Sequence, residues 1–136
     1  MRLAAKFWRL EPGRRALLME AAATLALASA ALAVLPFKRA IRAGTVPLRR
    51  DSRGDALEVV AAIETAARRL PWRNVCIHKG IAAQRMLRRR GLDARLHYGI
   101  GKDDGRLAAH VWVSLDGVPV IGGEEARAFA PVGAFP

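Results

Sequence analysis

The stretch ARLHYGIGKDDGRLAAHVWVSLDGVPVIGG (94–123) decides the fold, because here the apolar pattern changes from a helical period to a strand period. The predicted elements are, in order, a strand ARLHYGIG (94–101), a turn KDDG (102–105), a strand AAHVWVSL (108–115) and a strand VPVIGG (118–123). The dipeptide Asp116–Gly117 between the last two is typical of a two-residue hairpin turn. The stretch therefore predicts an antiparallel meander.

Upstream of this stretch the apolar residues follow a helical period. The predicted helices are EPGRRALLMEAAATLALASAALAVL (11–35), a second from about Asp55 to Leu70, and a third from about Cys76 to Arg90. Pro36 and Pro71 end the first two helices, and Gly91 follows the third, as terminators commonly do. Helices followed by an antiparallel meander predict an α+β fold.

Length and composition indicate one domain with a modest core, since the chain has 136 residues. Composition divides it into a helical, basic N-terminal region (1–50), which we expect to pack on the rest, and a mixed α/β domain (51–136). The 23 Lys and Arg against 12 Asp and Glu give a net charge of +11, which favours anionic partners. Nucleic acid is disfavoured, because few aromatic residues interleave with the basic ones.

The N-terminal region allows three interpretations. Its uninterrupted apolar run, AAATLALASAALAVLP (21–36), would be about 24 Å long as a helix, shorter than the roughly 30 Å hydrocarbon core of a bilayer. The segment ASAALA (28–33) also resembles a signal-peptide cleavage site. We expect first a soluble helix packing on the domain, second a membrane-associated helix and third a signal peptide. The expected location is therefore the cytoplasm, with a peripheral membrane contact as the second interpretation.

Cys76, the only cysteine, and His110 are the candidate catalytic pair. Cys76 stands in the first turn of a predicted helix, where backbone N–H groups and the helix dipole favour a thiolate and could hold an oxyanion. Arg73, His78 and Lys79 add positive charge nearby. His110 lies in a predicted strand, and such a Cys facing such a His predicts nucleophilic catalysis. The alternatives are a buried, inert Cys76 or an exposed Cys76 unrelated to His110.

The group that would orient His110 is less clearly marked. The hairpin register places Gly122 or Gly123 opposite His110, where an orienting carboxylate is expected. Glu124 follows immediately and is the candidate acid, ahead of Asp116, which is better interpreted as a turn former about 20 Å away along the strand. A backbone carbonyl, or a dyad without an acid, is an open alternative.

The remaining polar residues are not expected to take part in catalysis. His78 and the run RMLRRRG (85–91) are interpreted as solvated basic surface, with an acidic-peptide or phosphate contact as the second interpretation of the run. His97 could join Cys76 and His110 at a zinc ion, but the spacing is not that of common zinc motifs. No bound metal and no nucleotide motif are therefore expected.

A resemblance to a known family is carried by RNVCIHKGIAAQRMLRRRG (73–91), LDARLHYGIG (92–101), AHVWVSLDG (109–117), FAPVGAFP (129–136) and the basic helical region 11–42. In these segments the chain resembles the lasso-peptide leader peptidases, transglutaminase-like proteins related to the microcin-processing B protein, in their stand-alone form. The resemblance implies a transglutaminase-like, papain-like cysteine peptidase fold. It also implies a Cys-His-Asp triad, with Cys76 as nucleophile and His110 as base. The family's Asp falls near position 122, which is Gly122 here.

The resemblance further implies that the chain removes the leader from a ribosomally made precursor peptide. Its expected partners are that precursor, a small winged-helix leader-recognition protein, and an asparagine-synthetase-like lasso cyclase that uses ATP. No cofactor is expected in this chain, and any ATP requirement would belong to the partnered complex. The alternatives are a non-catalytic peptide-binding module of the same fold and a membrane-associated basic protein.

Overall fold

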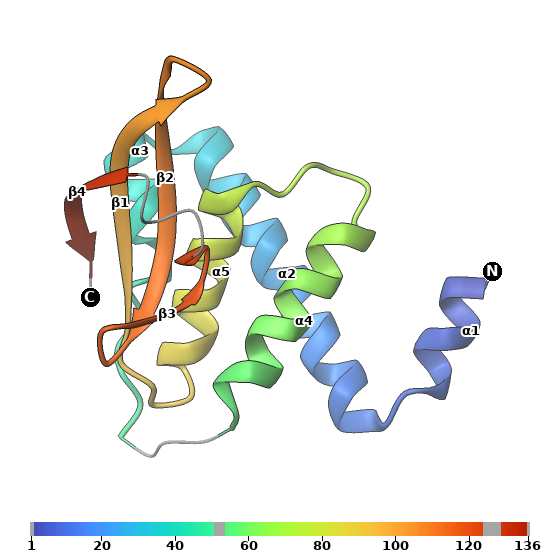
Figure 1. Ribbon diagram of the computed structural model, residues 1–136. Coiled ribbons are helices and arrows are strands. Elements are labelled where there is room, and N and C mark those ends of the chain that lie inside the picture. The colour runs from blue at the N-terminus through green and yellow to red at the C-terminus, as the bar shows by residue number, and fades with distance from the viewer. Residues whose placement is uncertain (1, 51–53, 124–128, 136) are drawn as a thin grey trace.

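The computed structural model describes residues 2–50, 54–123 and 129–135 (Figure 1). The elements are α1 (Arg2–Arg9), α2 (Pro12–Val34), α3 (Phe37–Ala40), the 3₁₀ turn η1 (Ile41–Gly44), α4 (Ala56–Arg69), α5 (Cys76–Arg88), β1 (Ala94–Asp103), β2 (Arg106–Leu115), β3 (Val118–Ile121) and β4 (Phe129–Phe135). Helices precede a four-stranded antiparallel sheet, so the α+β prediction is confirmed.

The three predicted helices are confirmed as α2, α4 and α5, each a residue or two shorter than expected. Helix α1 was not predicted. The chain breaks after it because Glu11 precedes Pro12 and takes an extended conformation, with ψ of 145°. Pro12 then begins α2, where its missing N–H leaves no helical hydrogen bond unmade.

The sheet has the strand order β3-β2-β1-β4. Both hairpin turns have two residues: Asp104–Gly105 between β1 and β2, and Asp116–Gly117 between β2 and β3, with φ of 50° at each Asp. The first turn is tighter than the predicted KDDG segment, and both strands extend to meet it. Strand β4 was not predicted as a strand, because Pro131 and Gly133 interrupt its pattern. An edge strand tolerates such residues.

Helices α2, α4 and α5 all lie on the same side of the sheet (Figure 1). They bury one core against it, in which Leu25 of α2, Ile63 of α4, Ile81 of α5 and Val113 of β2 are fully covered. Helix α2 therefore packs into the same core as the sheet. By length and composition alone α2 could also cross a membrane, a property that core helices and signal sequences share.

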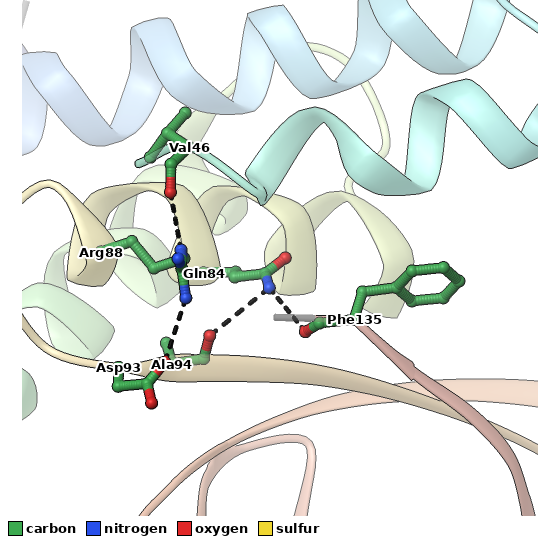
Figure 2. Close-up of polar contacts among 6 residues, drawn as sticks. All are labelled: Val46, Gln84, Arg88, Asp93, Ala94 and Phe135. Carbon is green, nitrogen blue, oxygen red and sulfur yellow. Dashed lines mark hydrogen bonds and ion pairs between the residues drawn. The ribbon is translucent and has the colours of Figure 1, made fainter. Parts of the chain in front are cut away.

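Polar side chains of α5 fasten the surrounding segments to this helix (Figure 2). Gln84 is fully buried, and its Nε2 donates to the carbonyls of Phe135 in β4, at 2.8 Å, and Ala94 in β1, at 3.4 Å. One turn later, Arg88 donates to the Val46 carbonyl at 2.7 Å and pairs with an Asp93 carboxylate oxygen at 3.0 Å. Helix α5 therefore fixes the segment after η1 and the C-terminal strand β4 relative to the rest of the sheet.

The contact between α5 and the sheet requires a glycine. A Cβ built on Gly80 would lie 2.6 Å from Val111 Cγ1 and 3.6 Å from Leu96 Cδ1. Val111 is β-branched and stiff at χ1, so it cannot simply rotate away. Gly80 thus sets the distance between α5 and β2.

We expect Gly80→Ala to destabilise the protein by about 1–2 kcal/mol in urea unfolding, because overpacking outweighs the gain in helix propensity. Gly13→Ala is the matched control, since Gly13 is also helical and has no atom within 4 Å of a built Cβ. That variant should be neutral or slightly stabilising. The double variant Gly80→Ala/Val111→Ala should recover part of the loss caused by the added methyl group. Equal effects of the two glycine substitutions would contradict this close contact.

Candidate active site

Cys76 is the first residue of α5, and its thiol is free and half-buried against the edge of the core. The preceding residue, Val75, is extended, so the helix begins at the cysteine itself. The loop before it is shaped by Trp72 and Asn74: Trp72 Nε1 donates to Asn74 Oδ1 at 2.9 Å, and Asn74 Nδ2 donates to the Trp72 carbonyl at 3.3 Å. The predicted position of Cys76 in the first helical turn is thus confirmed.

His78 does not act as the solvated basic residue that the sequence suggested. Its Nδ1 accepts a hydrogen bond from the Val75 N–H at 3.1 Å and so caps the start of α5. A nitrogen that accepts carries no proton, and burial lowers the pKa of this imidazole below its usual value. His78 is therefore neutral at pH 7 and adds no positive charge beside Cys76.

Lys79 also contributes less charge to the site than expected, because its Nζ pairs with Glu64 Oε2 of α4 at 3.3 Å. Arg73 is exposed, so water screens its effect on the thiol. The positive potential at Cys76 thus comes chiefly from the start of α5, where the first backbone N–H groups have no intrahelical acceptor.

His110 lies in the middle of β2, where its side chain is only 4% exposed. Its Nε2 lies 2.9 Å from the Gly122 carbonyl oxygen. Because a carbonyl only accepts, Nε2 must carry the hydrogen, and Nδ1 is the basic nitrogen of the neutral ring. The ring also stacks on Trp112, with centroids 6.1 Å apart. His110 is held in one orientation and one tautomer, as a general base requires.

The positions of Cys76 and His110 relative to the sheet are constrained by strand alternation. Val111 points toward α5, where it contacts Gly80, one helical turn after Cys76. Side chains alternate along a strand, so His110 and Trp112 point to the opposite face of the sheet. Helix α5 and β2 thus meet close to Cys76, but His110 projects from the face of the sheet opposite α5.

Position 122 lies beside His110, where the sequence placed the orienting group. A Cβ built on Gly122 would be 3.3 Å from His110 Nε2, close enough for a carboxylate there to reach the ring. With glycine at this position, the backbone carbonyl contacts Nε2 instead. Asp116 lies in the β2–β3 turn with a positive φ, in agreement with its interpretation as a turn former. Glu124 lies outside the described residues.

A second histidine, His97, lies beside Trp112 on the same face of the sheet as His110. His97 and Trp112 are register partners on β1 and β2, and their rings stack with centroids 5.5 Å apart. His97 Nε2 also lies 2.7 Å from Ser114 Oγ. Burial, and secondarily the charge of Arg95, lower the pKa of His97. The sequence predicts His97 and His110 in neighbouring strands, but the stack of His97 on Trp112 follows only from the register of β1 and β2.

The basic run at the end of α5 is structural, so its interpretation as solvated surface was wrong for three of its arginines. Arg85 donates to the Ala43 carbonyl at 3.0 Å, and Arg88 is 9% exposed. Arg90 pairs with Glu20 of α2 at 2.6 Å. These guanidinium groups satisfy backbone carbonyls and carboxylates because α5 lies at the centre of the fold.

Among the residues described by the structure, no three potential ligands gather to hold a metal ion.

The chain matches a known family. A family model described as "Transglutaminase-like superfamily" matches residues 15–134, which include α5, β1, β2 and β3 entirely and most of α2 and β4. Searches of the curated proteins and of the solved structures found no match.

We expect Gly122→Ala to destabilise the protein by about 1–3 kcal/mol, because φ is +73° and the new Cβ would lie 2.9 Å from the Val111 carbonyl oxygen. The variant should also shift the His110 ring ¹⁵N resonances, as the carbonyl moves away from Nε2. Gly117→Ala is the control: its φ is +80° but no atom lies within 4 Å of a built Cβ. Equal stability losses and an unchanged His110 spectrum would show that Gly122 does not position the imidazole.

Proposed function

The chain belongs to the transglutaminase-like superfamily, which includes cysteine peptidases, and on this basis we propose that it is a cysteine peptidase. We further propose that it removes the leader from a ribosomally made lasso-peptide precursor. The main support is the position of Cys76, a free thiol at the first residue of a helix inside the matched region. The finer assignment is supported by the resemblance of residues 73–91, 92–101, 109–117 and 129–136 to the leader peptidases.

The proposed mechanism begins with the Cys76 thiolate. Sγ attacks the carbonyl carbon at the leader–core junction, and the negative charge moves to the carbonyl oxygen. The Val75 N–H is already bonded to His78, so the Cys76 N–H at the start of α5 is the proposed oxyanion donor. Collapse of this intermediate breaks the peptide bond and leaves the leader attached to Sγ as a thioester.

His110 would carry the protons in this reaction. Because His110 lies on the face of the sheet opposite α5, this step requires a rearrangement that brings the imidazole within reach of Sγ. The ring would then take the thiol proton and give it to the leaving core amine. It then accepts a proton from water, whose hydroxide attacks the thioester and releases the leader as a carboxylate with the thiol restored. The Gly122 carbonyl would replace the family's carboxylate as the group that orients the imidazole.

The proposed setting is the cytoplasm, where the leader is first recognised by a small winged-helix partner. The freed core would then pass to an asparagine-synthetase-like cyclase, whose chemistry uses ATP. The net charge of +11 favours an acidic leader–partner complex, and such an association should weaken as salt is raised.

The alternative is a peptide-binding module of the same fold without catalysis. Two observations favour it: His110 projects from the face opposite α5, and glycine occupies the position expected for the acid. The two functions differ in the chemistry of Cys76, because only the peptidase needs a thiolate coupled to His110.

Alkylation of Cys76 by iodoacetamide across the pH range separates these functions. For a peptidase we expect rapid labelling well below pH 8, and a rate at pH 6.5 that falls roughly tenfold or more in His110→Ala. His97→Ala is the matched control, because it removes the other stacked histidine of the sheet and should leave the labelling profile unchanged. An ordinary thiol profile in both the native protein and His110→Ala would favour the binding module.

Leader removal itself can be followed by mass spectrometry on a synthetic lasso precursor, with its leader-recognition protein present. We expect Cys76→Ala and Cys76→Ser to abolish cleavage while leaving the thermal unfolding transition in place, because the thiol is the nucleophile. Cleavage at the native rate by Cys76→Ala would overturn the assignment. Coupled alkylation without cleavage would retain the peptidase but reject this substrate class.

A further inference from the structure

Helix α2 has two apolar faces rather than one. Its inner face packs into the core, where Ala21, Leu25 and Ala28 are fully buried. On its opposite side, the exposed residues form an outer stripe of Ala16, Met19, Ala23, Ala26, Leu27, Ala30, Ala33 and Val34. The outer stripe contains no polar side chain and runs for about 27 Å along the helix. A helix at a protein–water boundary normally turns a polar face outward. The apolar outer stripe therefore indicates that something other than water covers it.

Large apolar side chains extend the outer stripe at both ends. Within it, Met19 is 62% exposed and Val34 79% exposed. Near its N-terminal end, Trp8 of α1 is 70% exposed. Beyond its C-terminal end, Phe37 is 51% exposed but packs edge-on against Tyr98 of β1, with ring centroids 6.2 Å apart. The Arg15 guanidinium lies 5.1 Å from the centre of the Trp8 ring, which connects α1 to the start of α2. Aromatic residues beside arginine at the end of an apolar stripe are typical of membrane-surface helices.

Basic side chains flank both ends of the outer stripe. The exposed or half-buried basic residues are Arg9, Arg14 and Arg15 at its N-terminal end and Lys38 and Arg39 at its C-terminal end. The region 2–50 contains two acidic residues, and one of them, Glu20, is neutralised by Arg90. An apolar strip between two clusters of positive charge matches the acyl boundary and the anionic headgroups of a lipid surface.

We propose that the outer stripe docks α2 flat on the surface of a membrane that contains anionic lipids. The helix does not span the bilayer in this arrangement, because its inner face continues to cover the core formed with α4 and α5. The sheet lies on the other side of these helices, away from the docked face of α2 (Figure 1). The surface contact is independent of peptidase activity.

A second copy of the chain is a poorer occupant of the outer stripe. In an antiparallel pair, Arg14 and Arg15 of one copy would face Lys38 and Arg39 of the other. In a parallel pair, each basic cluster would face the equivalent cluster of the other copy. Both arrangements bring like charges together, whereas anionic headgroups neutralise the two clusters at once.

The test is co-sedimentation of the full chain with vesicles of phosphatidylcholine alone or with phosphatidylserine added. We expect binding to the phosphatidylserine vesicles, and weakening by roughly tenfold in Met19→Glu/Leu27→Glu, since two charges would enter the apolar boundary. Leu107→Glu/Val118→Glu is the matched control. It adds the same charge at exposed apolar residues of the sheet, and it should bind like the native protein.

The charge variant Lys38→Ala/Arg39→Ala provides a second measurement that leaves the helix packing unchanged. It should weaken binding to phosphatidylserine vesicles by roughly tenfold and make the remaining binding less sensitive to salt. Equal binding to both kinds of vesicle, equal loss in the stripe and control variants, or no binding by the native protein would overturn the proposal. A dimer in light scattering that Met19→Glu/Leu27→Glu dissociates would assign the outer stripe to a second copy instead.

Discussion

The close approach of α5 to the sheet at Gly80 is the constraint on which the rest of the structure depends. A Cβ at position 80 would lie only 2.6 Å from Val111 Cγ1, so the helix lies almost directly against β2. At this distance, Gln84 reaches the carbonyls of two strands, and Arg88 reaches the segment that follows η1. A larger residue at position 80 would lengthen each of these bonds. The same contact places the start of α5, and therefore Cys76, beside the sheet.

Positive charge has two separate uses in this protein. At the end of α5, Arg85, Arg88 and Arg90 are bound to carbonyls or carboxylates and hold the helices together. Around α2 the basic residues remain largely exposed, and they flank an apolar surface. A net charge of +11 therefore overstates the charge that a partner meets.

In the candidate site, Cys76 lies at the start of a helix, as the sequence predicts, whereas His110 contacts a backbone carbonyl where a carboxylate was expected. Cys76 has the free backbone N–H groups of a helix start. Because His78 is neutral and Lys79 is paired with Glu64, the positive charge near Cys76 is weaker than the sequence predicts. His110 is held by a carbonyl at a position where a carboxylate would also reach it. Because a carbonyl only accepts, this contact fixes the hydrogen of the imidazole on Nε2.

The sequence by itself determined the three main helices, the two hairpin turns and the position of Cys76, because prolines, glycines and apolar periods act locally. It also placed position 122 near His110, since a two-residue turn fixes strand register. Tertiary structure alone decided that His78 caps a helix, that three arginines are structural, and that His110 faces away from α5. These outcomes depend on which groups meet across the fold, and strand β4 likewise needed β1 as its hydrogen-bonding partner.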